Sequence, residues 1–268
     1  MIQPFIIGAP FGNYLSVPGV TSTVGTFTAK NRAGFLRWWL LWRIARTLRW
    51  HPGLGWTNKL GLPNPGIDHF YSWGVRHSGL VKEQIISVHG LEGDDWWKLL
   101  ELAKSLEPAA IELNVSCPNV GHLSVPKTLF ERSITPVVSA AGVPVRVPVI
   151  VKLPPVNYWE TFKLALASGV TTFHCTNTLP VPAGGLSGKP LKRVALDVIA
   201  RIKDHAPEVT VVGGGGITSP EDVADFRAAG AAHFAVASAF LNPLRALRAT
   251  SWMRSLGAEA PWVPPRIS

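Results

Sequence analysis

Eight short apolar segments alternate with stretches of helical periodicity, and this alternation restricts the fold of the chain more than any other feature. Several of the segments are continuous apolar runs, as expected where both faces of a parallel sheet are covered. Eight strands with helical crossovers close into a barrel more readily than they form an open sheet. The predicted strands are Phe5–Ala9, Thr26–Ala29, Ile85–Val88, Ala110–Asn114, Val149–Leu153, Thr172–Asn177, Val209–Gly213 and His233–Ala237.

The absence of a Gly-x-Gly-x-x-Gly pattern after the first strand disfavours the alternative, a doubly wound sheet. The predicted fold is therefore a single (β/α)₈ TIM barrel that spans residues 1–268, with a basic, Trp-rich inserted segment at about 35–50. Two predicted helices have clear start signals. One begins at Asp94 as N-cap and runs to Leu106, and the other follows Ser219 and Pro220 and ends at Gly230.

The charge balance favours anionic ligands. Lys and Arg number 26 against 17 Asp and Glu, a formal net charge of +9, which suits a phosphate, a carboxylate substrate or an acidic membrane surface. Nucleic acid is disfavoured because no helix-turn-helix, zinc-knuckle or RNA-binding signature is present. Two cysteines are too few for a disulfide framework, and neither a signal peptide nor a membrane-spanning apolar run is seen. We therefore expect a cytoplasmic protein.

Polar residues and glycines follow the predicted strands. Lys30, Asn114, Lys152, Asn177 and Gly213 each lie at or just beyond the carboxyl end of a strand. In a barrel these ends meet at one mouth, where active sites form. The run Gly213–Gly216 follows strand seven and Ala237–Ser238 follows strand eight, which are the loops where barrels commonly hold phosphate. The alternative for the glycine run is a flexible turn.

Cys117 lies on the loop after the fourth strand, between Asn114 and Asn119. A thiol in such a loop can act as a base or nucleophile if its pKa is lowered, and the alternative is a buried small hydrophobe. Cys175, inside a strand, is predicted to be packing. His89 and His174 are predicted to be ordinary hydrogen-bonded histidines at the barrel rim.

Four motifs resemble those of the dihydroorotate dehydrogenases, and they occur in the order found in that family. In chain order they are Asn58–Gly66, Ile111–Asn119, Gly184–Pro190 and the glycine run that ends at Ile217. The resemblance extends from Ala9 to Pro243. It implies FMN as cofactor, oxidation of dihydroorotate to orotate in pyrimidine synthesis, and no metal.

The resemblance also implies residue roles. Cys117 corresponds to the catalytic base, in the cysteine form of the soluble classes, and Lys152 to the lysine near flavin N1 and O2. The implied substrate-binding residues are Lys30, Asn58, Gly61, Leu62, Asn114, Asn119, Asn177 and Thr178. The implied FMN-binding residues are Ala9, Lys30, Asn114, Lys152, Gly188, Gly214, Gly215, Ala237 and Ser238.

The chain departs from the family pattern in three places, and the first and third bear on the electron acceptor and the oligomer interface. The loop 178–183 is short, Ala237–Ser238 replaces the usual Gly-Thr, and Phe35–Trp50 is unusually rich in Trp and Arg. This last segment is predicted to form an exposed amphipathic helix that docks on a membrane or a redox partner; packing on the barrel or in a homodimer is the alternative. The electron acceptor, whether fumarate, quinone or NAD, stays open. The other functions considered are an FMN-dependent pyrimidine reductase and a flavoprotein subunit active only with a redox partner.

Overall fold

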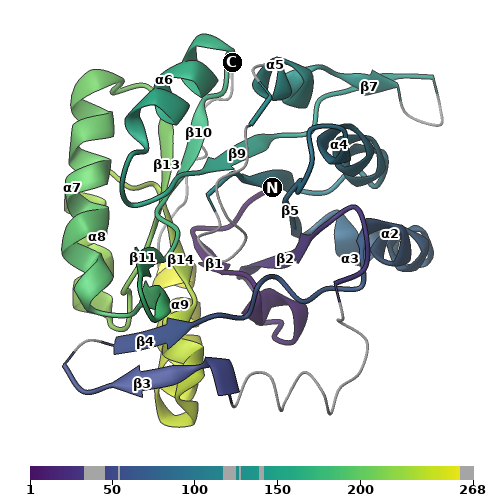
Figure 1. Ribbon diagram of the computed structural model, residues 1–268. Coiled ribbons are helices and arrows are strands. Elements are labelled where there is room, and N and C mark those ends of the chain that lie inside the picture. The colour runs from purple at the N-terminus through teal and green to yellow at the C-terminus, as the bar shows by residue number, and fades with distance from the viewer. Residues whose placement is uncertain (33–45, 54, 117–124, 127, 139–141, 260–268) are drawn as a thin grey trace.

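The computed structural model describes residues 1–32, 46–53, 55–116, 125–126, 128–138 and 142–259. Its centre is a closed barrel of eight parallel strands in the order β1-β14-β13-β10-β9-β6-β5-β2 (Figure 1). The strands are β1 (Phe5–Ile7), β2 (Thr21–Phe27), β5 (Ile85–Val88), β6 (Ala110–Asn114), β9 (Val149–Lys152), β10 (Thr172–Cys175), β13 (Thr210–Gly214) and β14 (His233–Val236). All eight coincide with predicted strands, so the predicted (β/α)₈ barrel is confirmed.

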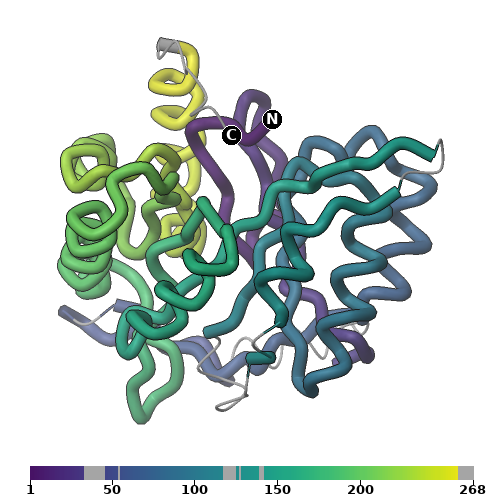
Figure 2. Tube along the Cα trace, turned by 90° about the horizontal axis from the view of Figure 1, so that it is seen from above, coloured from purple at the N-terminus to yellow at the C-terminus, as the bar shows by residue number. Residues whose placement is uncertain are grey.

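Helices surround the barrel. They are α2 (Ile67–Arg76), α3 (Ser78–Val81), α4 (Asp95–Ser105), α5 (Leu129–Ile134), α6 (Trp159–Ala167), α7 (Pro190–His205), α8 (Pro220–Ala228) and α9 (Pro243–Glu259), with short 3₁₀ helices η1 (Phe11–Asn13) and η2 (Ser238–Leu241). Figure 2 shows the helices of the first half of the chain, in blue, on one side of the strands and those of the second half, in green and yellow, on the other. Large buried side chains such as Trp96, Phe130, Phe162 and Phe226 fill the space between helices and strands.

The barrel interior has an apolar layer to which six of the eight strands contribute one residue each: Ile6, Ile85, Ala110, Ile150, Val212 and Ala235. Side chains of a strand alternate between its two faces, so the next inward positions lie two residues further along the chain. On β6 this position is Glu112, and the next is Asn114. The interior is therefore apolar at one level and polar nearer the carboxyl ends of the strands.

The two predicted helix starts differ in outcome. The start of α8 is confirmed, because Ser219 and Asp222 form a capping box and Pro220 is the first helical residue. At α4, Asp94 occupies the N-cap position, but its side chain makes no capping hydrogen bond. Its backbone is already helical, and the carboxylate of Asp95 instead accepts from the N–H groups of Leu91 and Glu92, at 2.9 and 3.1 Å.

Strand β2 begins at Thr21, five residues before the predicted start at Thr26. The run Thr21–Thr23 lacks the apolar character expected of a buried strand, but its hydroxyl groups have partners. The N–H of Gln3 donates to Thr21 Oγ1 at 2.8 Å, and Ser22 Oγ donates to the carbonyl of Leu15 at 3.1 Å. Satisfied hydroxyl groups make this polar strand compatible with a buried position.

A four-stranded antiparallel sheet joins two parts of the chain that are far apart in sequence. It consists of β3 (Arg49–His51), β4 (Gly55–Asn58), β11 (Leu179–Val181) and β12 (Gly184–Ser187), in the order β11-β12-β4-β3. The shortened loop 178–183 thus forms one strand of a hairpin. A separate pair consists of β7 (Val137–Val138) and β8 (Pro144–Val145).

This sheet corrects the prediction of one helix over Phe35–Trp50. Arg49 and Trp50 belong to β3, where antiparallel pairing with β4 places Trp50 opposite Trp56, with ring centroids 5.2 Å apart. Aromatic pairs across neighbouring strands stabilise a sheet, so the tryptophan at the end of the segment favours strand over helix. Residues 33–45, which hold most of the predicted helix, lie outside the described residues.

Candidate active site

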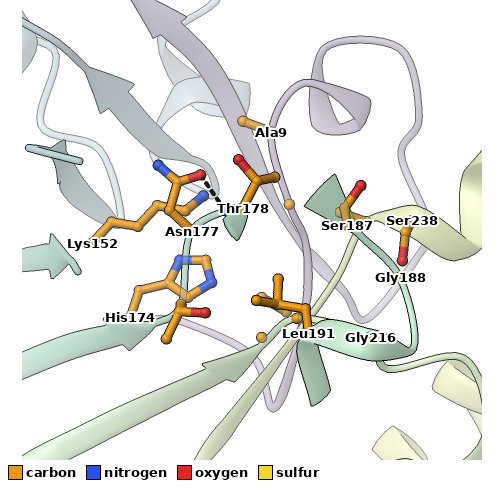
Figure 3. A pocket seen from close by; sticks show the side chains of 16 residues that line it. Ala9, Lys152, His174, Asn177, Thr178, Ser187, Gly188, Leu191, Gly216 and Ser238 are labelled. Carbon is orange, nitrogen blue, oxygen red and sulfur yellow. Dashed lines mark hydrogen bonds between the residues drawn. The ribbon is translucent and has the colours of Figure 1, made fainter. Parts of the chain in front are cut away.

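A pocket lies at the carboxyl ends of the barrel strands, where the sequence predicts an active site (Figure 3). Lys152 and His174 come from neighbouring strands β9 and β10 and are paired in register. Ser187, at the end of β12, and Ser238, at the start of η2, lie on another side of the pocket. The pocket therefore brings together the ends of the barrel strands and the edge of the small sheet.

Most of the residues predicted to bind FMN line this pocket. They are Ala9, Lys152, Gly188, Gly214, Gly215, Ala237 and Ser238, together with the predicted substrate residues Asn177 and Thr178. Asn114 does not line it but adjoins it, because Asn177 Nδ2 donates to Asn114 Oδ1 at 3.0 Å. The Thr178 N–H donates to Asn177 Oδ1 at 2.8 Å, which fixes the direction of that amide.

The remaining predicted residues lie elsewhere. Lys30 is exposed, and its carbonyl accepts from Thr28 Oγ1 at 2.7 Å. Asn58 is on β4, where its Nδ2 donates to the carbonyl of Gly185. The Gly61 carbonyl accepts from Arg32 Nε at 3.1 Å, and Leu62 is half-buried beside it. The predicted base Cys117 and the predicted amide Asn119 lie outside the described residues.

Two glycine loops form a narrow backbone cradle in the pocket. Gly188 has a φ of +104°, and Gly216 has a φ of +92°, a region that favours glycine. A Cβ on Gly216 would lie 2.7 Å from the carbonyl oxygen of Gly188, so a side chain there would force the two loops apart. Helix α7 begins at Pro190, two residues after Gly188, and its positive end favours an anion. The cradle fits a phosphate group.

A buried hydroxyl in the same pocket has no partner within the described ranges. Thr176 Oγ1 is inaccessible, and no described residue forms a hydrogen bond with it. Buried polar atoms are nearly always hydrogen-bonded. Thr176 lines the pocket but is not among the residues that the motifs predicted.

A buried carboxylate, Glu112, lies against the pocket and was also missed. Its Oε1 is 3.6 Å from Lys152 Nζ and accepts from Ser87 Oγ at 2.9 Å, while its Oε2 is 2.7 Å from His174 Nδ1. Burial acts to raise the pKa of Glu112, but the charge of Lys152 and the hydrogen bonds from His174 and Ser87 lower it to about 2. Glu112 is thus ionised at neutral pH and holds the Lys152 ammonium at the pocket.

His174 is more than the rim histidine that the sequence analysis predicted. Only 5% of its surface is exposed, and it lines the pocket. Burial lowers the pKa of its imidazole, as does Lys152, and together they outweigh the opposite effect of Glu112. The contact with Glu112 is therefore a hydrogen bond from a neutral imidazole and not an ion pair. The strand period carries a signal for Glu112, since Glu112 and Asn114 alternate with the apolar residues Ile111 and Leu113.

The expectations for Cys175 and His89 hold. Cys175 is fully buried in the main apolar core, and burial raises the pKa of its thiol, so it is a packing residue. His89 Nδ1 lies 2.5 Å from the carbonyl oxygen of Asn114, as expected of a hydrogen-bonded histidine, whereas its buried Nε2 has no hydrogen-bond partner among the described residues.

Sequence comparisons connect the chain to one family. The family described as dihydroorotate dehydrogenase matches residues 20–246. The dihydroorotate dehydrogenase B (NAD(+)) catalytic subunit of Alkaliphilus oremlandii is 34% identical over 207 residues, which is 70% of this chain and 68% of the relative. The dihydroorotate dehydrogenase A (fumarate) of Lactiplantibacillus plantarum is 32% identical over 199 residues, which is 66% of this chain and 64% of that relative.

Solved structures show the same fold. A crystal structure of DHODH from Eimeria tenella in complex with ferulenol has a TM-score of 0.69 at 19% identity. The superposition covers 94% of this chain and 81% of the Eimeria chain. The ligand-free form from the same organism has a TM-score of 0.67 at 18% identity. At this identity the similarity establishes the barrel alone.

Proposed function

The chain belongs to the dihydroorotate dehydrogenase family, and we propose on that basis that it oxidises dihydroorotate to orotate in pyrimidine synthesis with FMN as cofactor. The observation that carries the proposal is the pocket itself. It places a buried lysine, Lys152, and a glycine cradle at Gly188 and Gly214–Gly216 on opposite parts of one cavity at the barrel mouth. A phosphate-bearing flavin needs both features.

The pocket residues fit FMN in separate ways. Backbone N–H groups around Gly188, Gly215 and Ser238 would hold the phosphate, where glycine permits close approach. When bound, FMN supplies a hydride acceptor. The Lys152 ammonium, held by Glu112, would stabilise the negative charge that accompanies reduction, because it lies in a buried site where electrostatic effects are strong.

The substrate chemistry assigns roles to the loop after β6. Oxidation of a dihydropyrimidine removes a proton from one carbon and a hydride from its neighbour, so a base must lie within hydrogen-bond reach of that proton. We assign this role to Cys117. Asn114 and Asn177 supply amide donors and acceptors for a ring of alternating C=O and N–H groups, and Lys30 with these amides would bind the carboxylate. Recognition of a carboxylate distinguishes orotate from uracil-like rings.

The purified protein is expected to be yellow and to contain about one FMN per chain, because the glycine cradle and Lys152 line the same pocket. Heat denaturation should release a flavin that chromatography identifies as FMN. Release of FAD, or a colourless protein that does not bind added FMN, would contradict the proposed function.

The identity of the electron acceptor determines whether the chain needs a redox-partner subunit. The A. oremlandii relative is named a catalytic subunit of an NAD(+) enzyme, and the L. plantarum relative a fumarate enzyme. Steady-state assays of the isolated chain with fumarate, quinone and NAD in turn separate these possibilities. Activity with none of them, but with an artificial dye, would indicate a chain that needs a redox-partner subunit.

We also propose that the segment 35–50 contacts an anionic membrane surface. Within the described ranges, none of the helices combines the length and apolar character needed to cross a membrane. The segment combines Trp39 and Trp42 with Arg43 and Arg46, a composition that interfacial helices use at anionic headgroups.

The wild-type protein is expected to co-sediment with vesicles that contain anionic lipid and to detach as salt is added, because salt screens the attraction between arginine and headgroup. Arg43→Glu combined with Arg46→Glu should abolish the binding. The matched control is Arg76→Glu with Arg193→Glu, which makes the same charge change at exposed positions on α2 and α7. A wild-type protein that stays in the supernatant at low salt would refute the membrane contact.

A further inference from the structure

A continuous line of hydrogen bonds crosses the barrel interior and ends at Glu112. Asn177 Nδ2 donates to Asn114 Oδ1 at 3.0 Å, and Asn114 Nδ2 donates to Thr26 Oγ1 at 3.1 Å. Thr26 Oγ1 and Ser87 Oγ lie 2.9 Å apart, and Ser87 donates to Glu112 Oε1. Because the single hydroxyl proton of Ser87 is used on Glu112, Thr26 must donate to Ser87. Every step therefore points toward the carboxylate, which acts as acceptor only.

The same carboxylate determines the tautomer of His174. An ionised carboxylate offers no proton, so the 2.7 Å contact requires His174 Nδ1 to carry the hydrogen. In the neutral imidazole the lone pair then lies on Nε2. The groups that face His174 with charge are Glu112 from β6 and Lys152 from β9, whereas Val212 and Gly214 of β13, which lie beside it, carry no charge.

Nε2 of His174 lies beside Gly214 on the pocket lining. A Cβ on Gly214 would be only 2.7 Å from this nitrogen, so the glycine provides the space that the imidazole occupies. His174 is nine-tenths or more buried, and no residue in the described part of the chain forms a hydrogen bond with Nε2. Figure 3 shows the ring between Lys152 and Leu191, at the edge of the cavity. An acceptor without a partner in a ligand pocket indicates a ligand that donates.

We infer that His174 is a further cofactor-binding residue, whose Nε2 accepts a hydrogen bond from a hydroxyl or N–H group of the bound flavin nucleotide, and that Glu112 is the positioning residue that fixes this tautomer. The inference rests on the proposed function, since it requires a flavin in the pocket. The competing explanation is that His174 only supplies a counter-group to Glu112 and packs in the barrel.

Two substitutions separate these explanations, because each one replaces the hydrogen-bonding role of a different ring nitrogen. His174→Asn keeps an amide N–H that can donate to Glu112 from near the Nδ1 position and removes the acceptor at Nε2. His174→Gln places its amide oxygen near the Nε2 position. Ser87→Ala is the matched control, since it removes a donor to the same carboxylate at 2.9 Å but does not line the pocket.

The apoprotein of each variant is titrated with FMN, and quenching of flavin fluorescence gives the dissociation constant. His174→Asn should bind FMN roughly 2- to 12-fold more weakly, the factor expected for one neutral hydrogen bond. His174→Gln should recover most of the affinity, and Ser87→Ala should bind as the wild type does. Wild-type affinity in His174→Asn, or an equal loss in Ser87→Ala, would overturn the inference and leave the proposed function intact. No FMN binding by the wild type would instead refute the proposed function.

Two further measurements report on the protonation of the His174 imidazole. Nitrogen-15 NMR of the imidazole, assigned through loss of its signal in His174→Gln, should show a protonated Nδ1 and an unprotonated Nε2 that shifts when FMN is added. A protonated Nε2 at neutral pH would overturn the inference. Riboflavin, which lacks the titrating phosphate, should bind more weakly as acidification below the ordinary histidine range protonates Nε2, whereas His174→Gln should show no such loss. A parallel loss in both proteins would overturn it equally.

Discussion

The Cys117→Ala variant is expected to oxidise dihydroorotate about 10²- to 10⁴-fold more slowly than the wild type, which is the usual contribution of a positioned base. Cys117 follows β6, whose last residues Glu112 and Asn114 adjoin the pocket. The loss should appear in single-turnover reduction of bound flavin by dihydroorotate, because that step contains the proton removal. FMN should stay bound, since the pocket lining formed by the described residues does not depend on the thiol.

Two further variants control this result. Cys117→Ser should retain some activity and gain rate toward alkaline pH, because a serine hydroxyl is a poorer base than a thiolate. Cys175→Ala makes the same substitution as Cys117→Ala in a buried packing residue of β10, and it should reduce stability but leave the rate of flavin reduction in the folded protein near that of the wild type. Wild-type turnover in Cys117→Ala would place the base elsewhere.

The Glu112→Ala variant is expected to lose about 3–5 kcal/mol of unfolding free energy, the range found when one partner of a buried ion pair is removed. The substitution leaves the Lys152 ammonium in a buried site without its counter-charge and leaves His174 without its acceptor. Denaturant unfolding of the apoprotein measures the loss. Glu160→Ala is the matched control, because it removes a carboxylate from an exposed ion pair with Lys163 and should change the free energy by less than about 0.5 kcal/mol.

The stabilisation by Glu112 is expected to decrease as the pH falls. The pKa of Glu112 is lowered from 4.5 to about 2 in the folded protein. Its contribution is therefore present in full above pH 4.5 and is lost as the pH falls through the folded value, where the carboxylate takes up a proton. The difference in unfolding free energy between wild type and Glu112→Ala should narrow over that window. A difference that is small at neutral pH, or that is independent of pH, would show that the pair contributes little.

The sequence predicts the barrel well because its strands are buried on both faces and their apolar runs are hard to mistake. It fails at the start of β2, where Thr21 and Ser22 form a strand whose stability depends on partners at Gln3 and Leu15. It fails again at Arg49 and Trp50, where pairing with β4 overrides an amphipathic helical pattern. In each case the deciding contact is distant or cross-strand, and local periodicity does not contain it.

The candidate site is predictable where a motif specifies it and much less so where packing does. Lys152, Asn177 and the glycine loops were found because they follow strands and match a family pattern. The roles of Glu112 and His174 could not be predicted, because the role of a charged or titratable residue inside a strand depends on its cross-strand partners. Their contact depends on the parallel register of β6, β9 and β10, which the sequence does not state.

The closed barrel can form only late in the synthesis of the chain, because its first and last strands pair with each other. Strand β1 pairs with β14 through Phe5 and Phe234, so one edge of the first strand stays open until almost the whole barrel has left the ribosome. A chain that stops before β14 has two unpaired edges, on β1 and on β13, of the kind that recruit other chains into aggregates. Residues that line the pocket follow these same strands, as Ala9 follows β1 and Gly215 follows β13. The pocket is therefore completed in the same late step that protects the chain from aggregation.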